Sequence, residues 1–488
     1  MNVAIAVPAC VRRGTVRTAL LRVLAVATLL VAAHATAQSD RARVELGLGG
    51  HLVADAWNPV QVTVRDAAPS VLRLRIDEGS LLEGPRIVGY RAAVPGGSGV
   101  TVFQDDLYVP AFRSLSWTLV SGRTVLASGS LAAGDSDARP LDVVLSSSPG
   151  SWRGAFAPDA RLVEVAASDL PARAAAYDGV RAILVDGSAA APRAESIAAA
   201  AAGGAQVLLS SRLPASQAGL ARLAAAGSHR LGAGAVMHVA DDPEAVRARL
   251  ASWTPQERSR LVQALAADRL VRPPPTPSQP LMLSLAAAYA LVALLGLRFG
   301  GAPGLAAALV LALVVAVAGW RLLRPASPEL TASRTVLLGG GELALALTVG
   351  ERLTLPSGVV RFAGTGRPLT PVPYTVDDGT TEVTLARWHA VAVAARPALQ
   401  SAKLRFQAGR LHNDGAAPLR EVYVLGLGRQ PDLAAGAERS PTPGEEGDLP
   451  PELARLAALL PRGTALAQAP QAVWIALPSL AVGAGGGP

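Results

Sequence analysis

Apolar and polar residues alternate over residues 38–155, which is typical of β-strands with one buried face. The stretch WNPVQVTVRD places Val62 and Val64 on one side of an extended chain, and SVLRLRID repeats the pattern a few residues later. Clusters of turn-forming residues such as VPGGSG separate these stretches. Several short strands at this spacing predict an N-terminal β-sandwich domain.

The period changes over residues 156–272, where apolar strands alternate with helical stretches. VRAILVDG, which ends at Gly187, is apolar on both faces, as a central parallel strand is. The helical stretch APRAESIAAAAAGG ends at Gly203, AQVLLSS is the next strand, and GAVMHVA follows a second helix. This order predicts a flavodoxin-like α/β domain with a parallel sheet covered by helices. A proline-rich linker follows at 273–280.

Two apolar runs, within 281–299 and 302–323, are near the length that crosses a bilayer as a helix. Neither run has a polar face, so they predict a two-helix transmembrane hairpin; a buried helical hairpin in a soluble domain is the alternative. Alternation returns over residues 325–488, which predicts a second β-rich domain. Because the turn between the two runs is short, both soluble parts are expected on the same side of the membrane.

Residues 1–37 combine four arginines, the apolar run VLAVATLLVAA and a small-residue site, ATA, before Gln38. This is the pattern of a secretory signal peptide, with an uncleaved signal anchor as the alternative, and both export the domains that follow. Arginines that flank the hairpin outnumber Arg298 in its short turn, which taken alone favours the opposite orientation. We give the signal peptide precedence and predict a bacterial inner (cytoplasmic) membrane protein with extracytoplasmic, periplasmic domains.

The composition argues against several kinds of binding site. Cys10 is the only cysteine and lies in the signal peptide, so the exported chain has neither a disulfide nor a cysteine-based metal site. Lys403 is the only lysine, and such an arginine bias beside so much alanine and glycine reflects a GC-rich coding sequence. The arginines are scattered and aromatic residues make up only 4%, so no nucleic-acid partner is expected. Neither histidine spacing nor a glycine-rich loop indicates a metal or a cofactor.

The strand VRAILVDG, the helix after it and the stretch GGAQVLLSS resemble the class I glutamine amidotransferase-like fold. The whole plan resembles uncharacterised exported bacterial membrane-anchored proteins, in which such a domain lies between an N-terminal β-domain and a membrane anchor. The resemblance implies a cysteine in a Gly-x-Cys-x-Gly turn after the third strand, activated by a histidine. Here that turn reads LLSSRLP, and neither His229 nor His238 stands in the His-x-Glu setting of the family. The domain is therefore expected to be degenerate and without amidotransferase activity.

A candidate ligand crevice lies at the carboxyl ends of the parallel strands, where such sheets bind ligands. Four residues mark it, namely Asp186, Gly187, Ser210 and Ser211. The alternative is that Asp186 and Gly187 form an ordinary turn and that the two serines are polar loop residues. Adjacent acids such as Asp105 and Asp106 point to opposite faces of a strand, which argues against a catalytic dyad. The stretch DDGTTE (377–382) favours a hairpin turn, with a weak calcium site as the alternative.

These observations favour a non-enzymatic, membrane-anchored binding, assembly or sensing protein of the bacterial cell envelope, with an envelope protein or a glycan as its partner. Binding surfaces need no particular motif, and the edges of β-sheets are suited to docking. The alternative is an exported hydrolase of envelope glycan or peptide that uses Ser210 or Ser211 as its nucleophile, with Asp186 or a histidine. A third interpretation, a subunit of a transport complex, suffers from the lack of charges within the two apolar runs.

Overall fold

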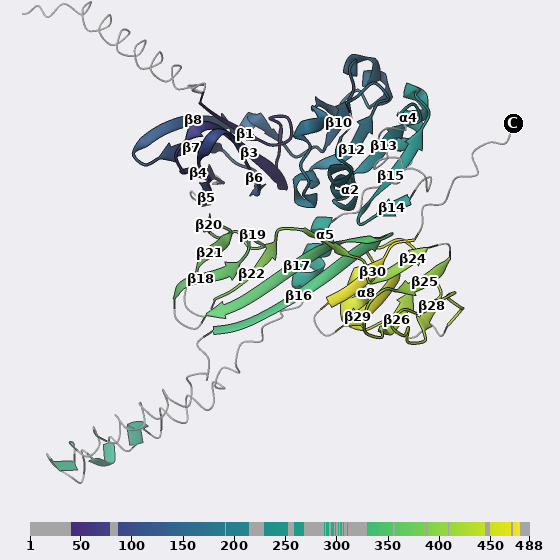
Figure 1. Ribbon diagram of the computed structural model, residues 1–488. Helices are drawn as coiled ribbons and strands as arrows, with labels where there is room; N and C mark the ends of the chain where they lie inside the picture. The colour runs from purple at the N-terminus through teal and green to yellow at the C-terminus, as the bar shows by residue number, and fades with distance from the viewer. Residues whose placement is uncertain are drawn as a thin grey trace, which may run out of the picture.

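The computed structural model in Figure 1 describes residues 41–78, 86–190, 192–213, 229–251, 258–267, 329–354, 357–385, 389–407, 409–444, 449–469 and 472–478, with scattered residues between 287 and 310. Over these residues the protein is a mixed α/β molecule with several sheets and strand-rich regions. The predicted signal peptide and the linker lie outside the described residues, as does most of the predicted hairpin at 281–299 and 302–323. Among the described residues, no helix is long and apolar enough to cross a membrane.

The N-terminal strands form two sheets over a common core. The first is antiparallel and contains β1 (Ala42–Leu46), β3 (Ala56–Ala67) and β6 (Gly97–Val109), in this order. The second contains β5 (Ile87–Val94), β4 (Ser70–Asp77), β7 (Ser114–Ser121) and β8 (Thr124–Ala132). The predicted alternation is confirmed, because Val62 and Val64 on β3 and Leu72 on β4 are buried while the residues between them are less so.

Strands from the far end of the chain complete the second sheet. β18 (Gly358–Ala363), β21 (Thr380–Leu385) and β20 (Tyr374–Asp377) extend it, and β20 pairs in parallel with β5. One hydrophobic core contains Val62 from the N-terminal half and Val360 and Val376 from the C-terminal half. The sequence left open whether the two β-rich domains pack together, and in the structure they share both a sheet and a core.

A two-residue turn joins β20 to β21. Asp378 and Gly379 occupy it with φ angles of 43° and 77°, the left-handed conformation that a type I′ hairpin requires. The Asp378 carboxylate accepts a hydrogen bond from the Ala93 amide at 2.7 Å, which fastens the turn to β5. The hairpin interpretation of 377–382 is thus confirmed.

The α/β domain has a sheet whose five parallel strands are β11, β10, β12, β13 and β15, in this spatial order. They span β10 (Leu141–Leu145), β11 (Arg161–Glu164), β12 (Val180–Val185), β13 (Gln206–Ser210) and β15 (Gly234–Val239), and β14 (His229–Leu231) is antiparallel at the edge. Numbered along the chain, the order is 2-1-3-4-5, which is that of flavodoxin-like sheets. The sequence analysis places the start of this domain at residue 156, but β10 lies before that residue and belongs to the parallel sheet. The sequence does not reveal this, because a five-residue apolar run fits either kind of sheet.

Helical segments cover both faces of this sheet. α2 (Ala194–Ala202) packs on one face, while α4 (Pro243–Ala251) and the 3-10 segment η2 (Pro149–Ala155) pack on the other. α5 (Arg258–Ala267) leaves the domain and packs instead on the C-terminal sheet, where Leu261 and Leu265 share a core with Leu345 and Leu347. The three parts of the molecule therefore contact one another (Figure 1).

The C-terminal sheet has nine strands over the described residues. Its central hairpin pairs β16 (Glu329–Gly340) with β17 (Leu343–Thr354), and α8 (Pro451–Ala457) packs on the same core as α5. The other strands are β19 (Gly366–Pro368), β22 (His389–Ala395), β23 (Ala398–Ser401), β26 (Arg420–Val424), β27 (Gly428–Gln430), β29 (Ala465–Ala469) and β30 (Ala472–Ala476). A small sheet of β24 (Leu404–Gln407), β25 (Arg410–Asn413) and β28 (Glu438–Arg439) lies beside it.

Candidate functional site

The order of the parallel strands reverses between β10 and β12. Flavodoxin-like sheets bind their ligands at this point, beyond the carboxyl ends of the strands. Here the strands end at Leu145 and Val185, so the loops that begin with Ser146 and Asp186 form the switch point. Asp186 and Gly187 therefore occupy the position that the sequence predicts for them.

Hydrogen bonds from its own domain surround the Asp186 carboxylate. It accepts from Ser146 Oγ at 2.5 Å, from Trp152 Nε1 at 3.0 Å, and from the Ser188 amide and hydroxyl at 3.1 and 3.0 Å. Three of these donors reach Oδ2 and the Ser188 amide reaches Oδ1, so both oxygens of the carboxylate are engaged within the domain. Burial raises the pKa of Asp186, but the hydrogen bonds outweigh burial and the pKa lies below its ordinary value. Asp186 thus fastens the loops after β10 and β12 together.

Ser210 is also held by hydrogen bonds to nearby residues of its own domain. It is 1% exposed, its Oγ lies 3.2 Å from Asp241 Oδ1, and it accepts a hydrogen bond from the Arg212 amide at 3.1 Å. A salt bridge of 3.0 Å joins Arg212 to Asp241. Ser211 donates its amide to the carbonyl of Val239. The two serines therefore belong to a closed network between the ends of β13 and β15.

Gly187 shows how closely these loops approach each other. A Cβ atom at this position would lie 2.8 Å from the Cβ of Arg212, closer than real Cβ contacts. The crevice between the loops after β12 and β13 is thus narrow where Gly187 faces Arg212. The structure brings Asp186, Gly187 and Ser210 to one edge of the sheet, as predicted, but it gives Asp186 and Ser210 separate sets of partners.

A nucleophilic serine needs a base within hydrogen-bond reach. His238 pairs in register with Leu209, so alternation along the strands directs it to the opposite face of the sheet from Ser210. Within the described part of the chain, the groups that contact the Ser210 hydroxyl are the Asp241 carboxylate and the Arg212 amide. A carboxylate is a much weaker base than an imidazole, and an amide N–H only donates, so the described residues around Ser210 do not form a Ser-His arrangement.

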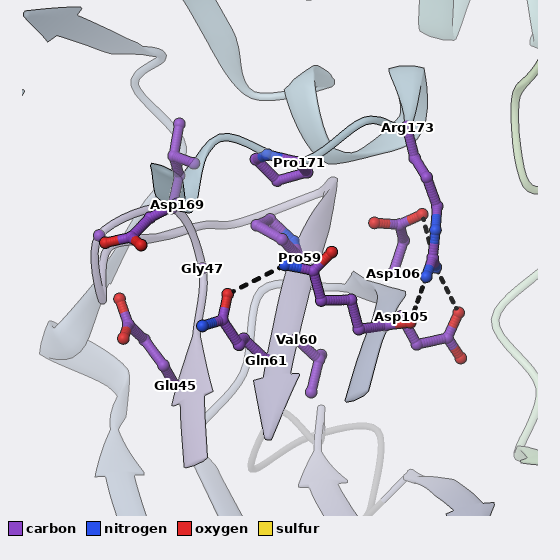
Figure 2. A pocket seen from close by; sticks show the side chains of 13 residues that line it. Glu45, Gly47, Pro59, Val60, Gln61, Asp105, Asp106, Asp169, Pro171 and Arg173 are labelled. Atoms are coloured by element: carbon purple, nitrogen blue, oxygen red, sulfur yellow. Dashed lines mark hydrogen bonds and ion pairs between the residues drawn. The ribbon is translucent and has the colours of Figure 1, made fainter. Parts of the chain in front are cut away.

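A second polar cluster lies where three parts of the molecule meet, and Figure 2 shows three of its residues, Asp105, Asp106 and Arg173. We call it the junction cluster; it contains Tyr90, Asp105, Asp106, Arg173 and Arg396. Asp105 accepts hydrogen bonds from Tyr90 Oη at 2.5 Å, from Arg173 Nη1 at 3.1 Å and from Arg396 Nη1. The tyrosine and the two acids belong to the N-terminal sheets, Arg173 to the α/β domain and Arg396 to the C-terminal domain.

Both arginines of the junction cluster reach both aspartates. Arg173 Nη1 and Arg396 Nη1 lie 3.5 and 3.8 Å from Asp106 Oδ2, in addition to their contacts with Asp105. The two acids are neighbours on β6, and the sequence analysis expects them to point to opposite faces of the strand. Both nevertheless contact the same two arginines, because the long arginine side chains reach them from outside the sheet. The result is an ionic contact between domains.

Asp106 is the most buried acid of the junction cluster. It is 1% exposed, and its Oδ2 has no hydrogen-bond partner among the described residues. Burial raises its pKa to about 6, although Arg173 and Arg396 act in the opposite direction. A cavity of about 20 Å³ beside it has room for one water molecule. Asp106 therefore titrates nearer to neutral pH than an ordinary aspartate.

A larger cavity of about 650 Å³, which we call the interdomain cavity, is lined by residues of all three parts. Asp178 organises one wall, because its carboxylate accepts from the Trp57 amide at 3.1 Å and pairs with Arg258 at 3.0 Å. On another wall the Arg367 guanidinium lies 4.2 Å from the ring of Tyr108. The volume of the interdomain cavity is in the range of small-molecule sites, which often lie between domains.

Sequence reasoning missed the arginines of both interdomain sites, Arg173, Arg258, Arg367 and Arg396. Each is one of many scattered arginines, and each meets a partner more than sixty positions away, so no local pattern marks it. The described residues contain no group of three or more metal-binding side chains.

No protein family matches the sequence, and no curated protein matches it. The resemblance to amidotransferase-like domains therefore stays a prediction from the sequence.

Proposed function

We propose that this chain is a membrane-anchored, non-enzymatic binding, assembly or sensing protein of the bacterial envelope, with its folded domains outside the cytoplasm. The pairing of β5 with β20 is the observation that supports this most. β5 precedes the apolar segment near residues 281–323 and β20 follows it, yet they are neighbours in one sheet. If the segment enters a membrane, it must therefore leave on the side from which it entered.

The exposed apolar side chains of the segment are compatible with the proposed membrane anchor. The described residues are helical, and their large side chains are 48–63% exposed at Tyr289, Leu291, Leu294, Leu295 and Val310. Water-exposed apolar helices are unfavourable, whereas a bilayer accepts them.

Two described glycines of this segment, eight positions apart, lie close together. A Cβ on Gly304 would lie 2.6 Å from the carbonyl oxygen of Gly296. In a straight helix, residues eight apart are separated by about 12 Å. Gly301, which lies between them, has a φ of 52°, the left-handed conformation that tight turns use.

The α/β domain supports a binding role over a catalytic one. Its flavodoxin-like strand order is compatible with the proposed resemblance to an amidotransferase-like fold, in which Ser210 and Ser211 would occupy the turn that carries the family's cysteine. Asp186 and Ser210 are engaged in hydrogen bonds that brace loops, and the interdomain cavity offers a recess for a ligand. The partner that we propose is an envelope protein or glycan.

Cysteine accessibility tests the proposed topology. In a Cys10→Ala background, Thr124→Cys and Ser440→Cys place single thiols at exposed positions before and after the apolar segment, and Arg298→Cys places one within its turn. A membrane-impermeant maleimide should label positions 124 and 440 in spheroplasts and position 298 only after permeabilisation. Opposite labelling of positions 124 and 440 would contradict the shared sheet. Equal labelling of all three would contradict the membrane anchor.

A further inference from the structure

A third cavity lies on the α/β domain, on the face covered by η2 and α4. Its volume is about 520 Å³, within the range of small-molecule sites. Three arginines line it, Arg153, Arg181 and Arg247, and we call it the arginine cavity. Of the described residues that line it, none is acidic.

The three guanidinium groups are neutralised to different extents. Arg181 forms a bidentate salt bridge to Asp142 through Nε and Nη2. The negative charge of Asp159 also attracts the Arg181 guanidinium. Arg247 donates Nε and Nη2 to the carbonyl of Gly154, a neutral acceptor that leaves its charge uncompensated.

The Arg153 side chain makes no hydrogen bond or ion pair with any described residue. Two of the three charges around the cavity are thus without a close counter-charge in the described part of the chain.

The remaining wall is apolar. Phe156, Pro158 and Leu250 line the cavity together with alanines and Gly154. A cleft that has one sign of charge and low-dielectric walls concentrates ions of the opposite sign. The fork of an arginine matches a phosphate in two hydrogen bonds. Several arginines around one recess favour a ligand with more than one negative charge.

We propose that the arginine cavity binds a small organic phosphate, with the phosphate groups on Arg153 and Arg247 and the apolar or planar remainder on Phe156, Pro158 and Leu250. Arg181 lines the same cavity, but Asp142 already neutralises its charge, so Arg153 and Arg247 are the main binding groups. The site is separate from the switch point and from the interdomain cavity, apart from Arg181, which lines both cavities. The proposal does not depend on the membrane anchor.

Binding to the purified full-length chain in detergent tests this site, with uridine diphosphate, inorganic pyrophosphate and citrate as probes. By calorimetry, uridine diphosphate should bind more tightly than pyrophosphate, and pyrophosphate more tightly than citrate. Affinity should fall as sodium chloride rises. Tighter binding of citrate would overturn the assignment to phosphate, and the absence of saturable binding by both phosphates would overturn the site.

Charge reversal locates the binding. Arg153→Glu should weaken uridine diphosphate about tenfold or more, because charged hydrogen bonds of this kind are worth one to two powers of ten. Arg123→Glu is the matched control, since Arg123 lies in an exposed turn and also lacks a partner among the described residues. Arg247→Ala provides a second, independent loss. Equal effects of Arg153→Glu and Arg123→Glu, or none from Arg153→Glu and Arg247→Ala, would overturn the proposal.

Discussion

The switch point around Asp186 and the junction cluster around Asp105 and Asp106 use the same kinds of side chain in opposite ways. Asp186 receives all its hydrogen bonds from neighbours in one domain, and its pKa falls. Asp106 meets arginines from two other domains without a hydrogen bond to its Oδ2, and its pKa rises. The first site braces a domain, whereas the second joins three parts of the chain at some cost in desolvation.

Loss of Asp105 should have the largest effect. Asp105→Ala leaves Tyr90, Arg173 and Arg396 without their common acceptor, and the loss of these partly buried hydrogen bonds costs about 3 kcal/mol. Urea unfolding of the full-length chain measures the loss. Asp432→Asn, at an exposed acid whose side chain has no described partner, should change stability by less than about 0.5 kcal/mol. Equal effects of the two substitutions would mean that the junction cluster does not join the domains.

Asp106→Asn should change how stability depends on pH. The pKa of Asp106 is about 6 in the folded protein against 3.8 ordinarily, so the folded state binds the proton more tightly. Its contribution is complete below pH 3.8 and is lost as pH rises through about 6, in total roughly 3 kcal/mol.

Asn at position 106 removes this dependence. The stability of the variant relative to the native chain should therefore be higher at pH 8 than at pH 4.5. Urea unfolding at the two pH values tests this, and a relative stability that is lower at pH 8 than at pH 4.5 would show that Asp106 is stabilising when charged.

Asp186→Ala should have a smaller and more local effect. It leaves Trp152 Nε1 and two serine hydroxyls without their acceptor, which costs about 2 kcal/mol. Because the pKa of Asp186 is lowered, its contribution is present above its ordinary pKa of 3.8 and is lost as pH falls through the folded value. This sign is opposite to that of Asp106.

Hydrogen exchange separates the two sites. Asp186→Ala should raise amide exchange in the α/β domain alone, whereas Asp105→Ala should raise it in all three parts. Exchange that spreads equally in both variants would remove the distinction between a local and an interdomain site.

Ser210→Ala should have the smallest effect. The substitution loses a hydrogen bond to Asp241 and one from the Arg212 amide, about 1 kcal/mol in total. Ser211→Ala, at an exposed position, should be neutral within about 0.5 kcal/mol. Activity profiling with serine-directed probes should label neither the native chain nor either variant. Labelling that Ser210→Ala abolishes would contradict the non-enzymatic proposal and favour a hydrolase.

The sequence predicts features that depend on near neighbours. The apolar run VRAILVDG, with Ile183 near its centre, predicts a buried strand and correctly places Asp186 and Gly187 at the end of β12. The DDG turn likewise predicts its hairpin, because Asp378 and Gly379 tolerate positive φ. Local patterns suffice where the partners are a few residues away.

Other features depend on partners that are distant in sequence. Nothing in Tyr374–Asp377 indicates that it pairs with β5 in place of a strand of its own domain. Leu141–Leu145 looks the same whether it belongs to a sandwich or to a parallel sheet. Arg173 and Arg396 resemble every other surface arginine until the fold brings them to Asp105.

The pairing of β5 with β20 joins the two β-rich domains in one sheet, and the proposed topology depends on it. Crosslinking between these two strands is therefore the most direct test. Arg91 and Asp377 are partners in the register, with Nε and Oδ1 3.7 Å apart and both side chains partly exposed. In a Cys10→Ala background, Arg91→Cys with Asp377→Cys should react efficiently with a short thiol crosslinker in membranes. The control pair, Arg91→Cys with Asp432→Cys, should not. Efficient crosslinking of the first pair alone is the predicted result, and failure of that pair, or equal yields from both, would contradict the shared sheet.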